Sequence, residues 1–133
     1  MSAPYTFGTT ISQPIAIVRT RAERALKDEG FGVLTEIDLA ATLKAKLGLD
    51  QPPYLILGVC NPGLAHRALE IDPSIGALLP CNVVLRQADE AEAIVEILDP
   101  VTALGITGSD AVAPGATEAA ERLRRVLDSM LTG

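Results

Sequence analysis

Short segments that are apolar or alternate between apolar and polar residues, each bounded by turn-forming residues, predict five β-strands. They cover residues 5–11, 31–37, 54–60, 81–87 and 93–98. In the second segment the alternation places Phe31, Val33, Thr35 and Ile37 on one side of the strand. The polar residues 88–90 separate the last two segments by a short turn, which is typical of a β-hairpin.

Apolar residues recur at helical spacing in four further segments. The first predicted helix starts at residue 15 and ends before Gly30, a residue suited to a left-handed cap. Asp38 is a suitable N-cap for a short helix that ends at Gly48, and a second short helix spans residues 62–71. The last helix carries its apolar face from residue 116 to residue 130, whereas the glycine-rich residues 101–115 predict a loop with one helical turn. These elements predict the α+β class, with two short inserted helices, in a single domain spanning residues 1–133.

Charge and aromatic content narrow the classes of partner. The formal net charge is −6, and aromatic residues make up 3% of the chain. Such a chain lacks both the positive charge and the stacking side chains that bind nucleic acid, and an anionic membrane surface would repel it. We therefore expect neither a nucleic-acid partner nor a membrane partner.

The apolar content is high for a small domain, at 48% of the residues. Because a chain of this size has a limited interior, the surplus predicts a homodimer or a pocket for a small apolar ligand. The N-terminal residues show no secretory signal, and no segment reaches the roughly 18 continuous apolar residues of a spanning helix. We expect a cytoplasmic protein, in which two cysteines are more often free thiols than a disulfide.

The candidate chemistry lies in a stretch that contains both cysteines and the single histidine of the chain. Each cysteine precedes an asparagine, as Cys60–Asn61 and Cys81–Asn82. One interpretation is architectural: Asn61 caps the following helix, the cysteines are small apolar residues, and Asn82 belongs to the start of a strand.

The other interpretation makes the same residues a ligand, thiol or metal site. The dipole of the following helix would lower the pKa of Cys60, His66 lies about a turn further on, and Cys81 arrives from a neighbouring strand. Two thiolates and an imidazole suit zinc, copper or a haem, and two thiols alone could act as a redox pair. The spacing of these three residues matches no standard zinc signature.

Several motifs that mark enzymes are missing from the sequence. It contains no Walker loop, no G-x-G-x-x-G, no G-x-S-x-G elbow and no H-E-x-x-H helix. His66 and Cys60 share one short segment, unlike a separate base and nucleophile. A hydrolase is therefore disfavoured, and we predict a non-enzymatic domain without catalytic residues.

Three stretches of the chain carry a resemblance to a known family. They are EGFGVLTEIDLAATLKAKLG, CNPGLAHRALEIDPSIGALLPCNVVL and ILDP, in the order expected for that family. Over nearly its whole length the chain resembles the bacterial and archaeal family catalogued as domain of unknown function 302, and its first helix is the least typical part. The resemblance implies a β-α-β(4)-α fold, with a curved antiparallel sheet around the C-terminal helix, and a protein that is often dimeric. It implies no activity.

The implied antiparallel sheet bears on the two cysteines. If strands 54–60 and 81–87 pair antiparallel, Cys60 and Cys81 share one edge of the sheet, whereas a parallel crossover would separate them by about 20 Å. Three functions stay open. They are a small-ligand or protein-binding module, which we favour, a metal-, haem- or thiol-redox protein using Cys60, Cys81 and His66, and a structural oligomer without a site.

Overall fold

The sheet of this protein is antiparallel throughout. A computed structural model describes residues 3–132 and contains a five-stranded sheet in the order β1-β5-β4-β3-β2. The strands are β1 (Thr6–Ile11), β2 (Gly32–Asp38), β3 (Tyr54–Cys60), β4 (Cys81–Asp89) and β5 (Glu92–Leu98). The α+β class is confirmed, and the predicted strand ends lie close to those observed.

Between α3 (Pro62–Ile71) and α5 (Ala113–Thr132) the structure contains two helices that the sequence did not predict. In chain order the helices are α1 (Ile15–Asp28), α2 (Leu39–Leu47), α3, the 3₁₀ helix η1 (Pro73–Leu78), α4 (Pro100–Gly105) and α5. The apolar periodicity does not reveal η1, and it predicts a loop over most of α4. Both begin at an Asp–Pro pair, where the aspartate caps the new helix: Asp72 accepts from Ser74 N at 3.0 Å and Asp99 from Val101 N at 2.9 Å. No helix within residues 3–132 is long and apolar enough to cross a membrane.

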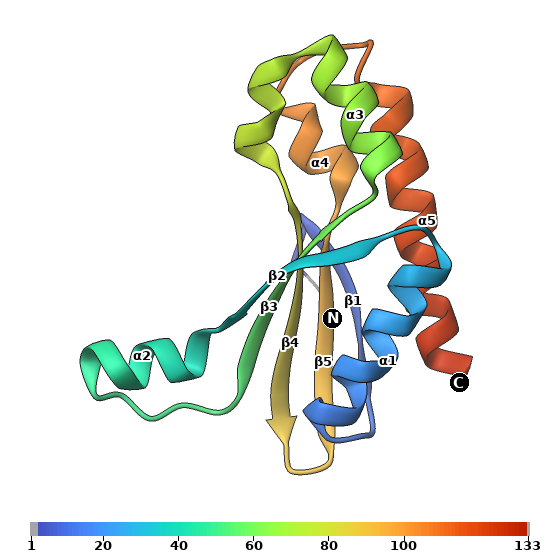
Figure 1. The fold of residues 1–133 in the computed structure, drawn as a ribbon. Coiled ribbons are helices and arrows are strands. Elements are labelled where there is room, and N and C mark those ends of the chain that lie inside the picture. The colour runs from blue at the N-terminus through green and yellow to red at the C-terminus, as the bar shows by residue number, and fades with distance from the viewer. Residues whose placement is uncertain (1–2, 133) are drawn as a thin grey trace.

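The core lies between one face of the sheet and the helices α1 and α5 (Figure 1). Alternate residues of β5, namely Ala93, Val95 and Ile97, are fully buried against them. Leu26 of α1 and Leu123 of α5 are also fully buried. This one-sided burial explains the alternating pattern of the strands, because side chains of successive residues point to opposite faces.

One side of β2 was predicted wrongly. Val33 opposes Val59 and faces the core, whereas Thr35 opposes Gly58 on the other face. The register shifts between Val33 and Thr35, because Leu34 is an extra residue in a β-bulge. A shift of one residue moves the following side chains to the opposite face of the sheet.

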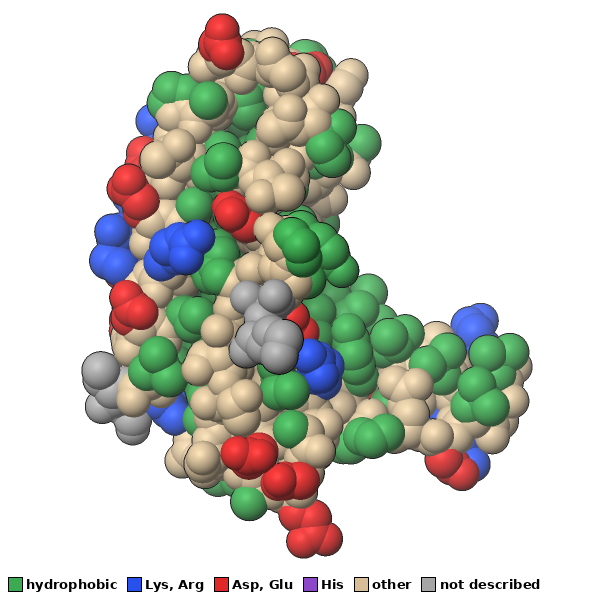
Figure 2. Space-filling view, turned by 180° about the vertical axis from the view of Figure 1, so that it is seen from behind, with side chains coloured by type: hydrophobic (Ala, Val, Ile, Leu, Met, Phe, Trp, Pro, Cys, Tyr) green, Lys and Arg blue, Asp and Glu red, His purple; other side chains and the backbone are tan. Residues whose placement is uncertain are grey.

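Residues 39–53, here called the arm, project from the body of the molecule (Figures 1 and 2). They comprise α2 and the segment that returns to β3. Both ends of α2 follow the predicted local signals: Asp38 accepts from Ala41 N at 2.9 Å, and Gly48 takes a left-handed φ of 68°. The helix nevertheless contains no buried residue.

Candidate functional site

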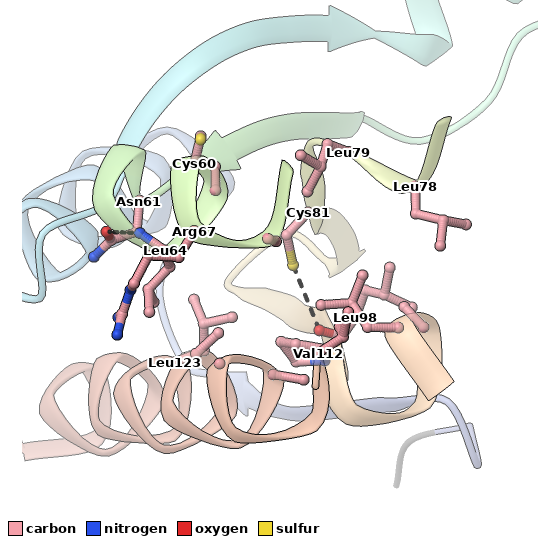
Figure 3. A pocket seen from close by; sticks show the side chains of 18 of the residues that line it. Cys60, Asn61, Leu64, Arg67, Leu78, Leu79, Cys81, Leu98, Val112 and Leu123 are labelled. Atoms are coloured by element: carbon pink, nitrogen blue, oxygen red, sulfur yellow. Dashed lines mark hydrogen bonds between the residues drawn. The ribbon is translucent and has the colours of Figure 1, made fainter. Parts of the chain in front are cut away.

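The two cysteines lie at the same end of neighbouring antiparallel strands, as the resemblance implied. Cys81 opposes Val59, and Cys60 opposes Gly32. Opposed residues share a face and consecutive residues do not, so Cys81 lies on the core face with Val59 while Cys60 points to the other face. Figure 3 shows the two sulfur atoms directed away from each other.

Neither thiol has the lowered pKa of a reactive cysteine. Cys81 Sγ donates a hydrogen bond to the carbonyl oxygen of Leu98 at 3.5 Å. Burial, together with the negative charge of Asp99, raises the pKa of Cys81 to about 12. Burial also raises the pKa of Cys60, which is the opposite of the lowering expected from the helix dipole. Both groups are therefore protonated near neutral pH.

His66 is separated from this chemistry by its position on the exposed side of α3. Its side chain is 74% exposed, and Nε2 lies 3.1 Å from Glu70 Oε1. In the part of the chain that the structure describes, no three His, Cys, Asp or Glu side chains gather as a metal site. The predicted set of Cys60, Cys81 and His66 is therefore not assembled.

The architectural interpretation of Asn61 is confirmed. Its Oδ1 accepts a hydrogen bond from Leu64 N at 3.1 Å, and Pro62 opens α3. Asn82 is an exposed residue of β4.

An apolar pocket lies beside the Cys60–Cys81 end of the sheet (Figure 3). Its cavity volume is ≈ 230 Å³. The strand ends, α3, α4 and α5 all contribute to its walls, which include Leu64, Leu79, Leu98, Leu104, Val112 and Leu123. Of the predicted site residues, Cys60, Asn61 and Cys81 line this pocket, and His66 and Asn82 are not among its lining residues.

A charged cluster borders the pocket on its solvent side. Arg67 lines the pocket with a side chain that is 62% exposed, and its Nη2 lies 3.3 Å from Glu118 Oε1. Glu118 also pairs with Arg122 at 3.0 Å. Hydrogen bonds from Arg67 and Arg122 hold the pKa of Glu118 below its usual value. The cluster thus links α3 to α5 beside the pocket.

The Cys–Asn pairs point to the sheet end of this site, but no predicted element corresponds to its outer wall. Leu104 and Val112 both fall in the segment predicted as a loop. The Asp99–Pro100 pair was the available signal, because Asp followed by Pro is a helix start as well as a strand end.

Comparison with known proteins establishes the family. A family model described as "Domain of unknown function DUF302" matches residues 7–130. The chain belongs to this family. A solved DUF302 structure, the crystal structure of an uncharacterized conserved protein from Bacillus stearothermophilus, is similar with a TM-score of 0.86 and 32% identity. The match covers 95% of this chain and 98% of that one, which confirms the predicted family and fold. No curated protein matches this DUF302 chain.

Proposed function

We propose that this DUF302 protein is a non-enzymatic binding module that holds a small apolar ligand in the pocket between the end of the sheet and helices α3, α4 and α5. The observation that carries the proposal is the composition of the walls, in which leucine, valine and alanine side chains from several elements converge on one cavity. Each square ångström of apolar surface that a ligand removes from water contributes about 25 cal/mol.

The cavity volume limits the size of the ligand. A buried apolar cavity of about 150 Å³ holds a benzene ring. A cavity of ≈ 230 Å³ therefore suits a molecule of roughly ten non-hydrogen atoms.

The polar groups of the site are better suited to orienting a bound ligand than to catalysing a reaction of that ligand. Cys81 contributes a protonated thiol, and Asn61 already accepts a hydrogen bond from the backbone of α3. Arg67 lies where the pocket meets solvent and could contact a polar end of the ligand. We also propose that the protein acts as a homodimer.

The ligand-binding proposal is tested with 1-naphthylamine, an uncharged apolar molecule of about the size that the cavity suits, whose fluorescence emission shifts to shorter wavelength in apolar surroundings. We expect saturable binding by the wild-type protein. Ala68→Leu adds bulk to a residue that lines the pocket and should weaken binding at least about tenfold by filling the cavity. Ala113→Leu is the matched control, because Ala113 is exposed and is not among the lining residues. Absence of saturable binding, or equal affinity in the two variants when both are folded by circular dichroism, would contradict the proposal.

A further inference from the structure

The face of the sheet opposite α1 and α5, here called the outer face, carries a row of apolar side chains. Ile37 opposes Ile56, and Ile56 opposes Val84, so the three form a row across β2, β3 and β4. Ile94 of β5 lies next to this row, since it opposes Arg86, two residues from Val84 on β4. These four apolar residues are only partly buried or exposed, and none belongs to the core cluster.

The arm adds a second apolar surface that the chain itself leaves uncovered. Leu47 at the end of α2 is 65% exposed, and Leu49 beyond it is 53% exposed. Figure 2 shows hydrophobic side chains gathered in the angle where the arm meets the body. Isolated helices shorter than about 12 residues are marginal in water. A helix of nine residues with none buried is therefore expected to need a packing partner.

The total surface area is larger than that of a monomer of this mass. The chain exposes 7476 Å². A monomeric protein of 13.9 kDa exposes about 6,700 Å². The excess of about 800 Å² equals the area that each partner loses in a protein–protein interface of standard size.

Charge favours self-association through these surfaces. The chain has a net charge of −6, so two copies repel each other through most of their surface. Beside the apolar row, Arg86 and Glu96 neutralise each other, with Nη2 2.9 Å from Oε1. On the arm, Lys44 pairs with Asp50 at 2.8 Å, and Lys46 adds a positive charge. Two copies therefore meet with least repulsion at the outer face and the arm.

We propose that the outer face and the arm form the contact surface of the homodimer proposed above, on which this inference rests, in a two-fold arrangement where each arm lies across the outer face of the partner. A two-fold axis uses the same patch on both subunits. Each subunit must then carry both of the surfaces that touch in the dimer. This chain has both, namely a projecting apolar arm and an open apolar sheet face. The second copy covers both surfaces at once and removes the excess area.

The test is sedimentation equilibrium of the full chain and of three variants. We expect a wild-type dimer. Leu47→Glu on the arm and Ile37→Glu on the outer face should each weaken the dimer at least about a hundredfold, because each places an unpaired charge in the interface twice. Ile106→Glu is the matched control: Ile106 is 77% exposed but follows α4, outside both surfaces, and the dimer should persist.

Two results would overturn this dimer. The first is a wild-type protein that is monomeric at tens of micromolar, which would assign the surfaces to a different occupant. The second is a folded Leu47→Glu or Ile37→Glu variant whose dimer dissociates no more readily than that of Ile106→Glu. The dimer measurement is independent of ligand binding, because the pocket lies away from the arm. Leu47→Glu should therefore bind the naphthylamine probe with the same affinity as the wild-type protein.

Discussion

Gly58 is a position where the structure predicts a large effect of a single added carbon. It lies inside β3, and a Cβ there would be 2.3 Å from Thr35 Oγ1 and 2.8 Å from Pro80 Cγ. Side chains do not tolerate contacts this short, so Gly58→Ala must displace β3, β2 or the start of β4. We expect the free energy of unfolding to fall by about 1–3 kcal/mol. In urea the midpoint should decrease while the slope is unchanged.

The same substitution at Gly115 is the control. A Cβ at Gly115 meets no atom within 4 Å, and the residue lies inside α5. Gly115→Ala should therefore raise the free energy of unfolding, by about 0.4–1 kcal/mol. Thr35→Ala removes the hydroxyl group, so the Gly58→Ala/Thr35→Ala double variant should recover part of the loss. All variants are unfolded at one protein concentration, because association shifts apparent stability. A similar loss at both glycines, or no recovery in the double variant, would refute the steric reasoning.

Three further predictions concern the Cys–Asn pairs. Asn61→Ala should lower the free energy of unfolding by about 1 kcal/mol through loss of the α3 cap, while Asn82→Ala at an exposed position should have little effect in the same urea titration. Iodoacetamide at pH 8 should alkylate Cys60 before Cys81, because Cys81 is more deeply buried and has a pKa of about 12; peptide mapping that finds Cys81 modified first would contradict this. The raised pKa of Cys81 means that its thiol ionises first in the unfolded chain, so stability should fall as pH rises from 9 to about 12. Cys81→Ala should make that fall smaller, and an unchanged pH dependence would count against the burial argument.

Local signals were sufficient to predict most elements from the sequence. Asp38 and Asn61 cap helices as expected, and Gly30 and Gly48 adopt left-handed φ angles after helices. Each of these features depends on a few neighbouring residues, which is why the sequence reveals it. The Asp–Pro pairs were ambiguous, because the same two residues can end one element and cap the next.

Features that depend on strand register could not be predicted in this way. The bulge at Leu34 changes which face Thr35 and Ile37 occupy, and nothing in the alternation of β2 reveals an extra residue. The directions of Cys60 and Cys81 likewise depend on a one-residue offset between β3 and β4. The family resemblance therefore implied that the cysteines lie at the same end of the sheet, but it could not show that their thiols point to opposite faces. Ligand binding, the homodimer and the cytoplasmic location stay predictions.

The apolar surplus of the chain posed a choice between a pocket and an interface, and the structure provides a surface for each. Val59 and Cys81 line the pocket on the core face, whereas Ile56 and Val84 belong to the outer face. Since alternate residues of the same two strands serve the two surfaces, a side chain can be changed on one face without altering the other. Ala68→Leu should therefore affect probe binding alone, and Leu47→Glu should affect association alone. Gly58→Ala is different, because it displaces the backbone of β3 that both surfaces share, and we expect it to weaken probe binding and dimerisation together.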